Sequence, residues 1–227
     1  NLLHKQGKFK ESAKYLKVAN DECLKYKKSD SSLKIKHTEL YRSLKIKKTK
    51  NKNLKNSSNY VFIVGMPRSG STLLENILSL NSEVTDMGEV NFLEESIKEA
   101  KDFEDVYDLY EKKVINQFQS SIIYTDKSLF NYIYCAVISN FFPKAKIINC
   151  IRNPLDNILS IYKANFLKQS FSFSLTDISS LYLHYFETIE EYKTKYGENI
   201  YDYHYEDLIE NPNNVIPGII KWLDWDW

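Results

Sequence analysis

The chain has 227 residues, with 31 Lys and Arg against 30 Asp and Glu, which gives a formal net charge of +1. This near-neutral balance argues against a general nucleic-acid binder, because such proteins usually carry a basic excess. Three distant cysteines and four scattered histidines predict neither a zinc cluster nor a disulfide framework. The longest apolar stretch, around Ile133–Phe142, is too short to span a bilayer.

Residues 1–44 are predicted to be helical. Phe9, Ala13 and Leu16 recur at helical spacing, and Gly7 together with Phe9 and Ala13 resembles the second half of a tetratricopeptide repeat. One such unit cannot bury its own apolar face, so we expect the end of a longer array that starts upstream. An ordinary amphipathic helix packed on the main domain is the alternative.

Residues 45–59, KIKKTKNKNLKNSSN, are rich in Lys and Asn and predict a solvated linker before a main domain at 60–227. Strands are expected in the main domain at Tyr60–Val64, Ser121–Thr125, Lys146–Ile151 and Ile200–His204. Helices are expected at Thr72–Leu80, Phe92–Lys113, Asn131–Phe142, Leu155–Leu167 and Thr176–Lys195. Because helices separate the strands, the sequence predicts an α/β fold with a P-loop-type parallel sheet flanked by helices. Ligands in such folds bind beyond the carboxyl ends of the strands.

The first expected strand runs into a glycine-rich loop, YVFIVGMPRSGST. Gly65 and Gly70 have the spacing of the phosphate-binding pattern G-x-x-x-x-G-K-[ST], and Thr72 fills its last position. Ser71 stands where the pattern has lysine, and the only cation of the loop is Arg68. A nucleoside triphosphatase uses that lysine to reach the β- and γ-phosphates.

A ligand without β- and γ-phosphates does not need the lysine. A single phosphate that carries another anionic group can be held by a guanidinium such as that of Arg68, in bidentate fashion. The glycines let the backbone approach the ligand, and the amides at the start of the following helix attract anions. Hydroxyl donors are added by Ser69, Ser71 and Thr72.

A second motif, INCIRNPLDNILSIY, spans Ile148–Tyr162. Arg152 follows an expected strand, Pro154 suits the first turn of the next helix, and Ser160 lies on that helix. If the helix leans back over the strand end, Arg152 and Ser160 can contact one anion. By itself an Arg-Asn-Pro turn is a weak signal.

Together the two motifs resemble those of the sulfotransferases that use PAPS, 3′-phosphoadenosine 5′-phosphosulfate. GMPRSGSTLLENIL resembles the 5′-phosphosulfate loop of that family, and CIRNPLDNILSIY resembles its 3′-phosphate motif. The resemblance covers about Tyr60–Trp227. It is closest to the protein-tyrosine sulfotransferases and to bacterial relatives that carry tetratricopeptide repeats. It implies PAPS as co-substrate, no metal, and nucleotide contacts from Arg68, Ser69, Gly70, Ser71, Thr72, Arg152 and Ser160.

The resemblance also implies catalytic residues. Glu89, in DMGEVNF, stands at the position of the catalytic base, and Lys127, in YTDKSLFN, at that of a lysine that stabilises the transferring sulfate. Arg68 would stabilise the same charge. These types suit an in-line attack on sulfur, because a carboxylate can accept the proton of the acceptor and cations can stabilise the leaving phosphate oxygen. Tyr203–Pro212 resembles a later family segment that we expect to be structural.

The sequence departs from the family pattern after IPGIIKWLDWDW. The family chain usually continues there, with nucleotide contacts and a serine near the transferring group, so we expect a fragment at both ends whose own activity is open. Two other functions are compatible with parts of the sequence. A P-loop nucleoside triphosphatase or small-molecule kinase would use Asp126 for magnesium, and an interaction module would rest on residues 1–44 alone.

The acceptor stays open among protein tyrosine, a sugar hydroxyl and a small phenol, with Glu89 favouring a phenolic or peptidyl hydroxyl. The helical residues 1–44 could also bind a protein or peptide partner. No nucleic-acid partner and no transmembrane segment are expected. No signal peptide is visible, so the expected location is cytoplasmic, although a targeting segment could precede Asn1.

Overall fold

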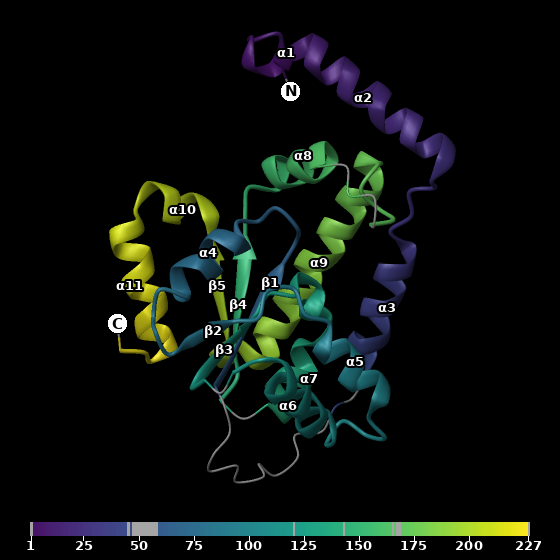
Figure 1. Ribbon diagram of the computed structural model, residues 1–227. Coiled ribbons are helices and arrows are strands. Elements are labelled where there is room, and N and C mark those ends of the chain that lie inside the picture. The colour runs from purple at the N-terminus through teal and green to yellow at the C-terminus, as the bar shows by residue number, and fades with distance from the viewer. Residues whose placement is uncertain are drawn as a thin grey trace.

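The computed structural model describes residues 2–44, 46, 59–119, 121–142, 144–164, 166 and 169–226. These residues form a five-stranded sheet in the order β2-β3-β1-β4-β5, with every strand pair parallel (Figure 1). The strands are β1 (Asn59–Gly65), β2 (Val84–Asp86), β3 (Ile123–Asp126), β4 (Lys146–Ile151) and β5 (Ile200–His204). The prediction of a parallel sheet flanked by helices is confirmed. All four expected strands are present, and β2 is an additional short one.

Helices cover both faces of this sheet (Figure 1). The α-helices are α1 (Leu2–Lys5), α2 (Phe9–Tyr26), α3 (Ser32–Ser43), α4 (Ser71–Leu78), α5 (Phe92–Glu99), α6 (Val106–Gln117), α7 (Cys135–Phe141), α8 (Pro154–Ala164), α9 (Leu175–Tyr196), α10 (Tyr205–Glu210) and α11 (Pro212–Leu223). Two 3₁₀ turns are η1 (Leu129–Tyr134) and η2 (Gly197–Asn199). None of the described helices is long and apolar enough to cross a membrane.

The central strand β1 has apolar side chains on both faces, because successive residues of a strand point to opposite sides. Tyr60, Phe62 and Val64 belong to the larger core, on the side of α5, α6, α7 and α9. Val61 and Ile63 belong to a smaller core, under α4 and α11. A strand buried on both faces reads as a continuous apolar run, which is why the sequence identified it.

One predicted helix is wrong as a single element. The segment expected as Phe92–Lys113 forms two helices, α5 and α6, which pack against each other. Between them the Asp102 carboxylate accepts a hydrogen bond from the Glu104 backbone N–H at 2.9 Å. Such a local turn competes with the helix for backbone donors. The segment expected as Asn131–Phe142 is likewise divided, between η1 and α7.

Of the segment predicted to be helical, 1–44, the described residues form the three helices α1, α2 and α3. Helix α2 extends away from the sheet (Figure 1) and contacts the main body through Asn20, whose Nδ2 donates to the Tyr162 carbonyl at 3.3 Å. Helix α3 packs on α9 and η1. The tetratricopeptide assignment stays a prediction. Of the expected linker, residues 45 and 47–58 lie outside the described residues.

Candidate active site

The glycine-rich loop joins β1 to α4 at the carboxyl end of the sheet. Gly65 has φ +146°, and an added Cβ would lie 2.6 Å from the carbonyl oxygen of Cys150 on the neighbouring strand. Gly70 has φ +90°, and its Cβ would lie 2.3 Å from the ring of Tyr205. Arg68 also has a positive φ, 69°. The two glycines therefore permit a turn that side chains would block.

Helix α8 is attached to this loop. Asn153 precedes the helix, and its Oδ1 accepts from the backbone N–H groups of Leu155 and Asp156 at 3.0 and 3.3 Å. One turn later, Asn157 donates from Nδ2 to the Pro67 carbonyl at 2.9 Å. The Asn-Pro pair thus starts the helix, and the next Asn holds that helix against the loop.

This arrangement brings the two sequence motifs into contact. Arg68 donates from Nε to the Ser160 hydroxyl at 3.3 Å, and Arg152 donates from Nη1 to the Arg68 carbonyl at 3.1 Å. The two contacts connect residues 92 and 84 positions apart in the chain. One cluster therefore contains two guanidinium groups, those of Arg68 and Arg152, and the hydroxyl of Ser160 on α8.

Further elements hold Arg152 in place. Its guanidinium carbon lies 4.9 Å from the centre of the Tyr205 ring, and its carbonyl accepts from the Tyr182 hydroxyl at 3.3 Å. Its Nε is buried and has no hydrogen-bond partner among the described residues, and the same is true of the Ser69 hydroxyl. Buried donors of this kind normally have a partner, so both fit a site for an anion.

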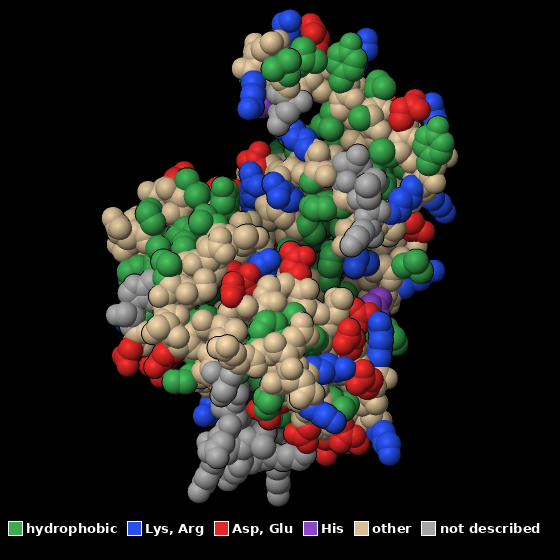
Figure 2. Space-filling model, viewed as in Figure 1, with side chains coloured by type: hydrophobic (Ala, Val, Ile, Leu, Met, Phe, Trp, Pro, Cys, Tyr) green, Lys and Arg blue, Asp and Glu red, His purple; other side chains and the backbone are tan. Residues whose placement is uncertain are grey.

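A second set of polar side chains in the site comes from the loops that follow β2 and β3. The Lys127 backbone N–H donates to the Gly88 carbonyl at 2.9 Å, which joins the loops after these two strands. The Lys127 ammonium lies 3.2 Å from Glu89 Oε1 and 3.6 Å from Glu75 Oε2. Glu89 is largely exposed, with 71% of its side chain accessible, whereas Lys127 and Glu75 are at 8% and 5%. Figure 2 shows acidic and basic side chains side by side near the carboxyl ends of β1 and β4.

Glu75, which contacts this lysine, and Asp126, which precedes it in the chain, both have buried side chains. Burial raises the pKa of Glu75, and this rise is partly offset by Lys127 and by the hydrogen bond at 3.2 Å from the Thr125 hydroxyl. Burial also raises the pKa of Asp126 to about 7. The Asp126 oxygens accept from the Tyr110 hydroxyl at 3.0 Å and the Ser128 backbone N–H at 2.9 Å. Asp126 is thus engaged inside the core and does not face the loop as a ligand for magnesium.

Comparison with known proteins assigns the chain to a family. The sequence profile described as the sulfotransferase family matches residues 61–123 and 98–227. The chain belongs to the sulfotransferase family. An uncharacterized protein of Aquifex aeolicus (strain VF5) is 27% identical over 194 residues, which cover 74% of this chain and 26% of that protein. The chain therefore spans about a quarter of the length of this curated relative.

Solved structures share the fold. The sulfotransferase domain of the Synechococcus PCC 7002 olefin synthase aligns over 81% of this chain and 78% of its own, with a TM-score of 0.55 and 20% identity. Mouse sulfotransferase SULT7A1 complexed with PAP aligns over 74% of this chain and 60% of its own, with a TM-score of 0.52 and 16% identity. At these identities the likeness concerns the fold of this sulfotransferase-family chain.

Sequence reasoning missed three residues of the site. Glu75 is a charged residue among the apolar residues of α4, a pattern that could have identified it as buried and paired. Tyr205 and Glu206 directly follow β5, where the strand-end rule applies. Tyr205 packs on Arg152 and Gly70, and Glu206 accepts from the Asn153 backbone N–H at 2.9 Å. The segment expected to be only structural therefore supports the site.

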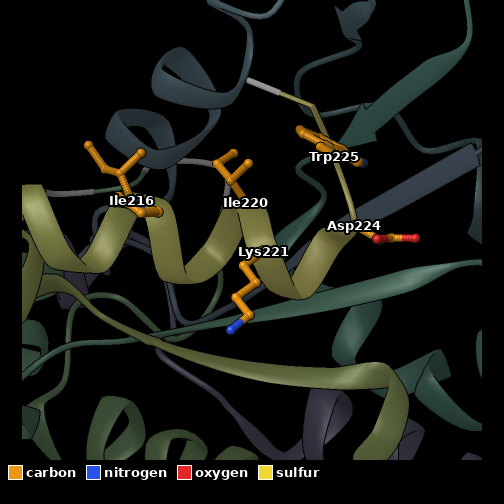
Figure 3. A pocket seen from close by; sticks show the side chains of 6 residues that line it. Ile216, Ile220, Lys221, Asp224 and Trp225 are labelled. Atoms are coloured by element: carbon orange, nitrogen blue, oxygen red, sulfur yellow. The ribbon is translucent and has the colours of Figure 1, made fainter.

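A separate pocket of about 390 Å³ lies along α11 (Figure 3). In Figure 3, Ile216 and Ile220 point to the side of the helix on which Trp225 lies, whereas Lys221 points away. None of the residues expected to bind nucleotide or to act in catalysis lines this pocket.

Proposed function

We propose that the chain is the catalytic domain of a PAPS-dependent sulfotransferase that transfers a sulfuryl group to an acceptor hydroxyl. The observation that carries the proposal is the contact between the two anion-binding motifs, Arg68 with Ser160 and Arg152 with the Arg68 carbonyl. A nucleotide with one anionic group at each end of its ribose needs two such motifs side by side. A ligand with a single phosphate group needs only one such motif.

In this proposal the loop holds the 5′-phosphosulfate. Arg68, Ser69, Gly70, Ser71 and Thr72 would supply a guanidinium, hydroxyls and the amides at the start of α4, which favour an anion. Arg152 and Ser160 would hold the 3′-phosphate. Ser69 Oγ and Arg152 Nε, which are buried and have no hydrogen-bond partner in the described part of the chain, support this division, because each would gain a partner from one of the two anionic groups.

The exposed Glu89 is proposed as the general base. PAPS supplies a sulfur atom whose bond to the phosphate oxygen breaks as the bond to the acceptor oxygen forms. Glu89 accepts the proton of the acceptor hydroxyl, and Lys127 and Arg68 stabilise the negative charge that grows on the leaving phosphate oxygen. The 3.2 Å contact of Lys127 with Glu89 supports roles on the two sides of one reacting centre.

The acceptor class that suits Glu89 is a phenolic or peptidyl hydroxyl, with protein tyrosine as the first candidate and a sugar hydroxyl as the alternative. A phenol loses its proton more readily than a sugar alcohol, so one exposed carboxylate is a sufficient base. The helices before β1 are proposed to contact a protein or peptide substrate, since α2 extends beyond the carboxyl end of the sheet (Figure 1).

Calorimetry tests the donor. Adenosine 3′,5′-bisphosphate, the desulfated product, is titrated into the protein without metal, and ATP with magnesium is titrated separately. We expect the bisphosphate to bind without metal and ATP to bind much more weakly. Equal affinities, or a magnesium requirement for the bisphosphate, would overturn the proposal in favour of a P-loop nucleoside triphosphatase or kinase.

A further inference from the structure

We infer that Glu75 is the positioning residue of Lys127, which it holds from the buried side so that the ammonium faces the transferring sulfuryl group. The inference rests on the proposed function for the role of Lys127. It adds a residue that neither the sequence motifs nor the comparisons single out.

The geometry places Glu75 behind the lysine. The carboxylate lies in α4, one turn after the phosphate-binding loop, and its Oε2 is 3.6 Å from the Lys127 ammonium. Its other oxygen accepts from the hydroxyl of Thr125 at 3.2 Å, and Thr125 lies in β3, two residues before Lys127, which directly follows that strand. Thr125 thus orients the carboxylate, and the carboxylate orients the lysine.

The two carboxylates beside Lys127 differ in environment. Glu89 is 71% exposed and Glu75 is 5% exposed, while the lysine between them is 8% exposed. A buried ammonium needs a partner to remain charged. When the sulfuryl donor enters, its anionic group competes with Glu89 for the exposed side of Lys127. Glu75 cannot be displaced in this way, because it contacts Lys127 from inside the fold.

This arrangement has a functional consequence. If Glu89 were the only partner of Lys127, the position of the lysine would change whenever the catalytic base moved. With Glu75 as a second, permanent partner, Lys127 can exchange Glu89 for the sulfuryl group and keep its place. Glu89 is then free to accept the proton of the acceptor.

A double-mutant cycle on turnover tests the inference. Glu75→Gln keeps an oxygen for Thr125 but loses the charge that faces Lys127. We expect kcat to fall roughly tenfold, within the range of about two- to 150-fold for coupled neighbours. In a Lys127→Ala background the same change should have almost no further effect on kcat. An equal loss in both backgrounds would overturn the inference, since Glu75 would then act independently of the lysine.

A second readout does not need activity. Reductive methylation of the native protein, followed by mass spectrometry of its peptides, measures how readily the Lys127 amine reacts. Glu75→Gln should raise labelling of Lys127 several-fold and leave Lys34, a lysine packed over the Phe130 ring, unchanged as internal reference. Equal labelling of Lys127 in the wild-type protein and in Glu75→Gln would overturn the inference. A rise in Lys34 labelling that matches the rise at Lys127 would also overturn it, because it would indicate a general loss of packing.

Matched controls separate the possible failures. Glu83→Gln removes the same charge from an exposed glutamate and should alter neither readout. If Glu75→Gln does not fold, as judged by circular dichroism, Glu75→Asp withdraws the carboxylate by one methylene and should act in the same direction, more weakly. Failure of the wild-type protein to bind adenosine 3′,5′-bisphosphate would refute the proposed function, whereas the labelling would still decide whether Glu75 holds Lys127.

Discussion

Replacement of Arg152 by alanine should separate the two ends of the nucleotide. The Arg152 Nη1 donates to the Arg68 carbonyl at 3.1 Å, whereas its Nε is buried and has no hydrogen-bond partner within the ranges that the structure describes. At least one charged donor is therefore free for a 3′-phosphate. A hydrogen bond to a charged group is worth ~1.5–3 kcal/mol, which corresponds to a loss of roughly ten- to 150-fold in affinity.

The assay compares two ligands in the same calorimeter. Adenosine 3′,5′-bisphosphate carries the 3′-phosphate, and 5′-AMP does not. Arg152→Ala also removes the contact with the Arg68 carbonyl and the packing on Tyr205, but these losses weaken both ligands equally. The difference between the two affinity changes therefore isolates the 3′-phosphate contact. Arg42→Ala, which removes an arginine of α3 that pairs with Glu191, is the matched control and should change neither affinity.

One result would refute the reasoning. If both ligands weaken by the same factor in Arg152→Ala, the arginine shapes the loop and does not contact the 3′-phosphate. The loop around Arg68 would then be a site for one anionic group only.

Three further predictions follow from the fold and the site. Glu89→Gln should lower kcat by ~10²–10⁴ with nearly unchanged bisphosphate affinity, and the defect should shrink for acidic phenols; near-native turnover of an alcohol-like acceptor would exclude Glu89 as the base. Gly70→Ala should lower the free energy of unfolding in urea titrations by ~1–3 kcal/mol and weaken bisphosphate binding, because residue 70 has φ +90° and an added Cβ would meet the Tyr205 ring. Gly197→Ala, a control with open space around the added Cβ, should change neither stability nor binding. Because burial raises the pKa of Asp126 from 3.8 to about 7, the native protein binds an extra proton in that window, and stability should fall as pH rises from about 4 to about 7. Asp126→Asn should lack this part of the pH dependence. If the free energy of unfolding changes with pH in the same way in the variant and the wild-type protein, the prediction is contradicted.

Much of the sheet could be predicted from the sequence for a simple reason. Strands β1 and β4 both carry apolar side chains in the two cores, so β1 appears as an unbroken apolar run and β4 as a run interrupted only by Asn149 after its first residue, and each ends at a polar motif. The loop after β1 needs glycine at the two positions where a Cβ would meet neighbouring atoms, and this requirement is visible as the spacing of Gly65 and Gly70. Pro154 likewise marks the start of α8.

Short and locally determined features were harder to predict. Strand β2 has three residues, which is too few for a period to show, and its place at the edge comes from pairing with β3. The division between α5 and α6 includes a local turn, in which the Asp102 carboxylate accepts from the Glu104 backbone N–H. A pattern averaged over a long window does not resolve either feature.

The sequence by itself determined the kinds of group at the site. A glycine loop with an arginine and no lysine, a second arginine and a lysine were each expected after a strand, and a carboxylate was expected from the resemblance to the family. Only the tertiary structure decided which of them touch. The packing of α8 on the loop joins Arg68 to Ser160, and the fold of α4 onto β3 sets Glu75 beside Lys127. These contacts connect residues 92 and 52 positions apart, so they depend on how helices pack on a sheet, which local sequence patterns do not encode.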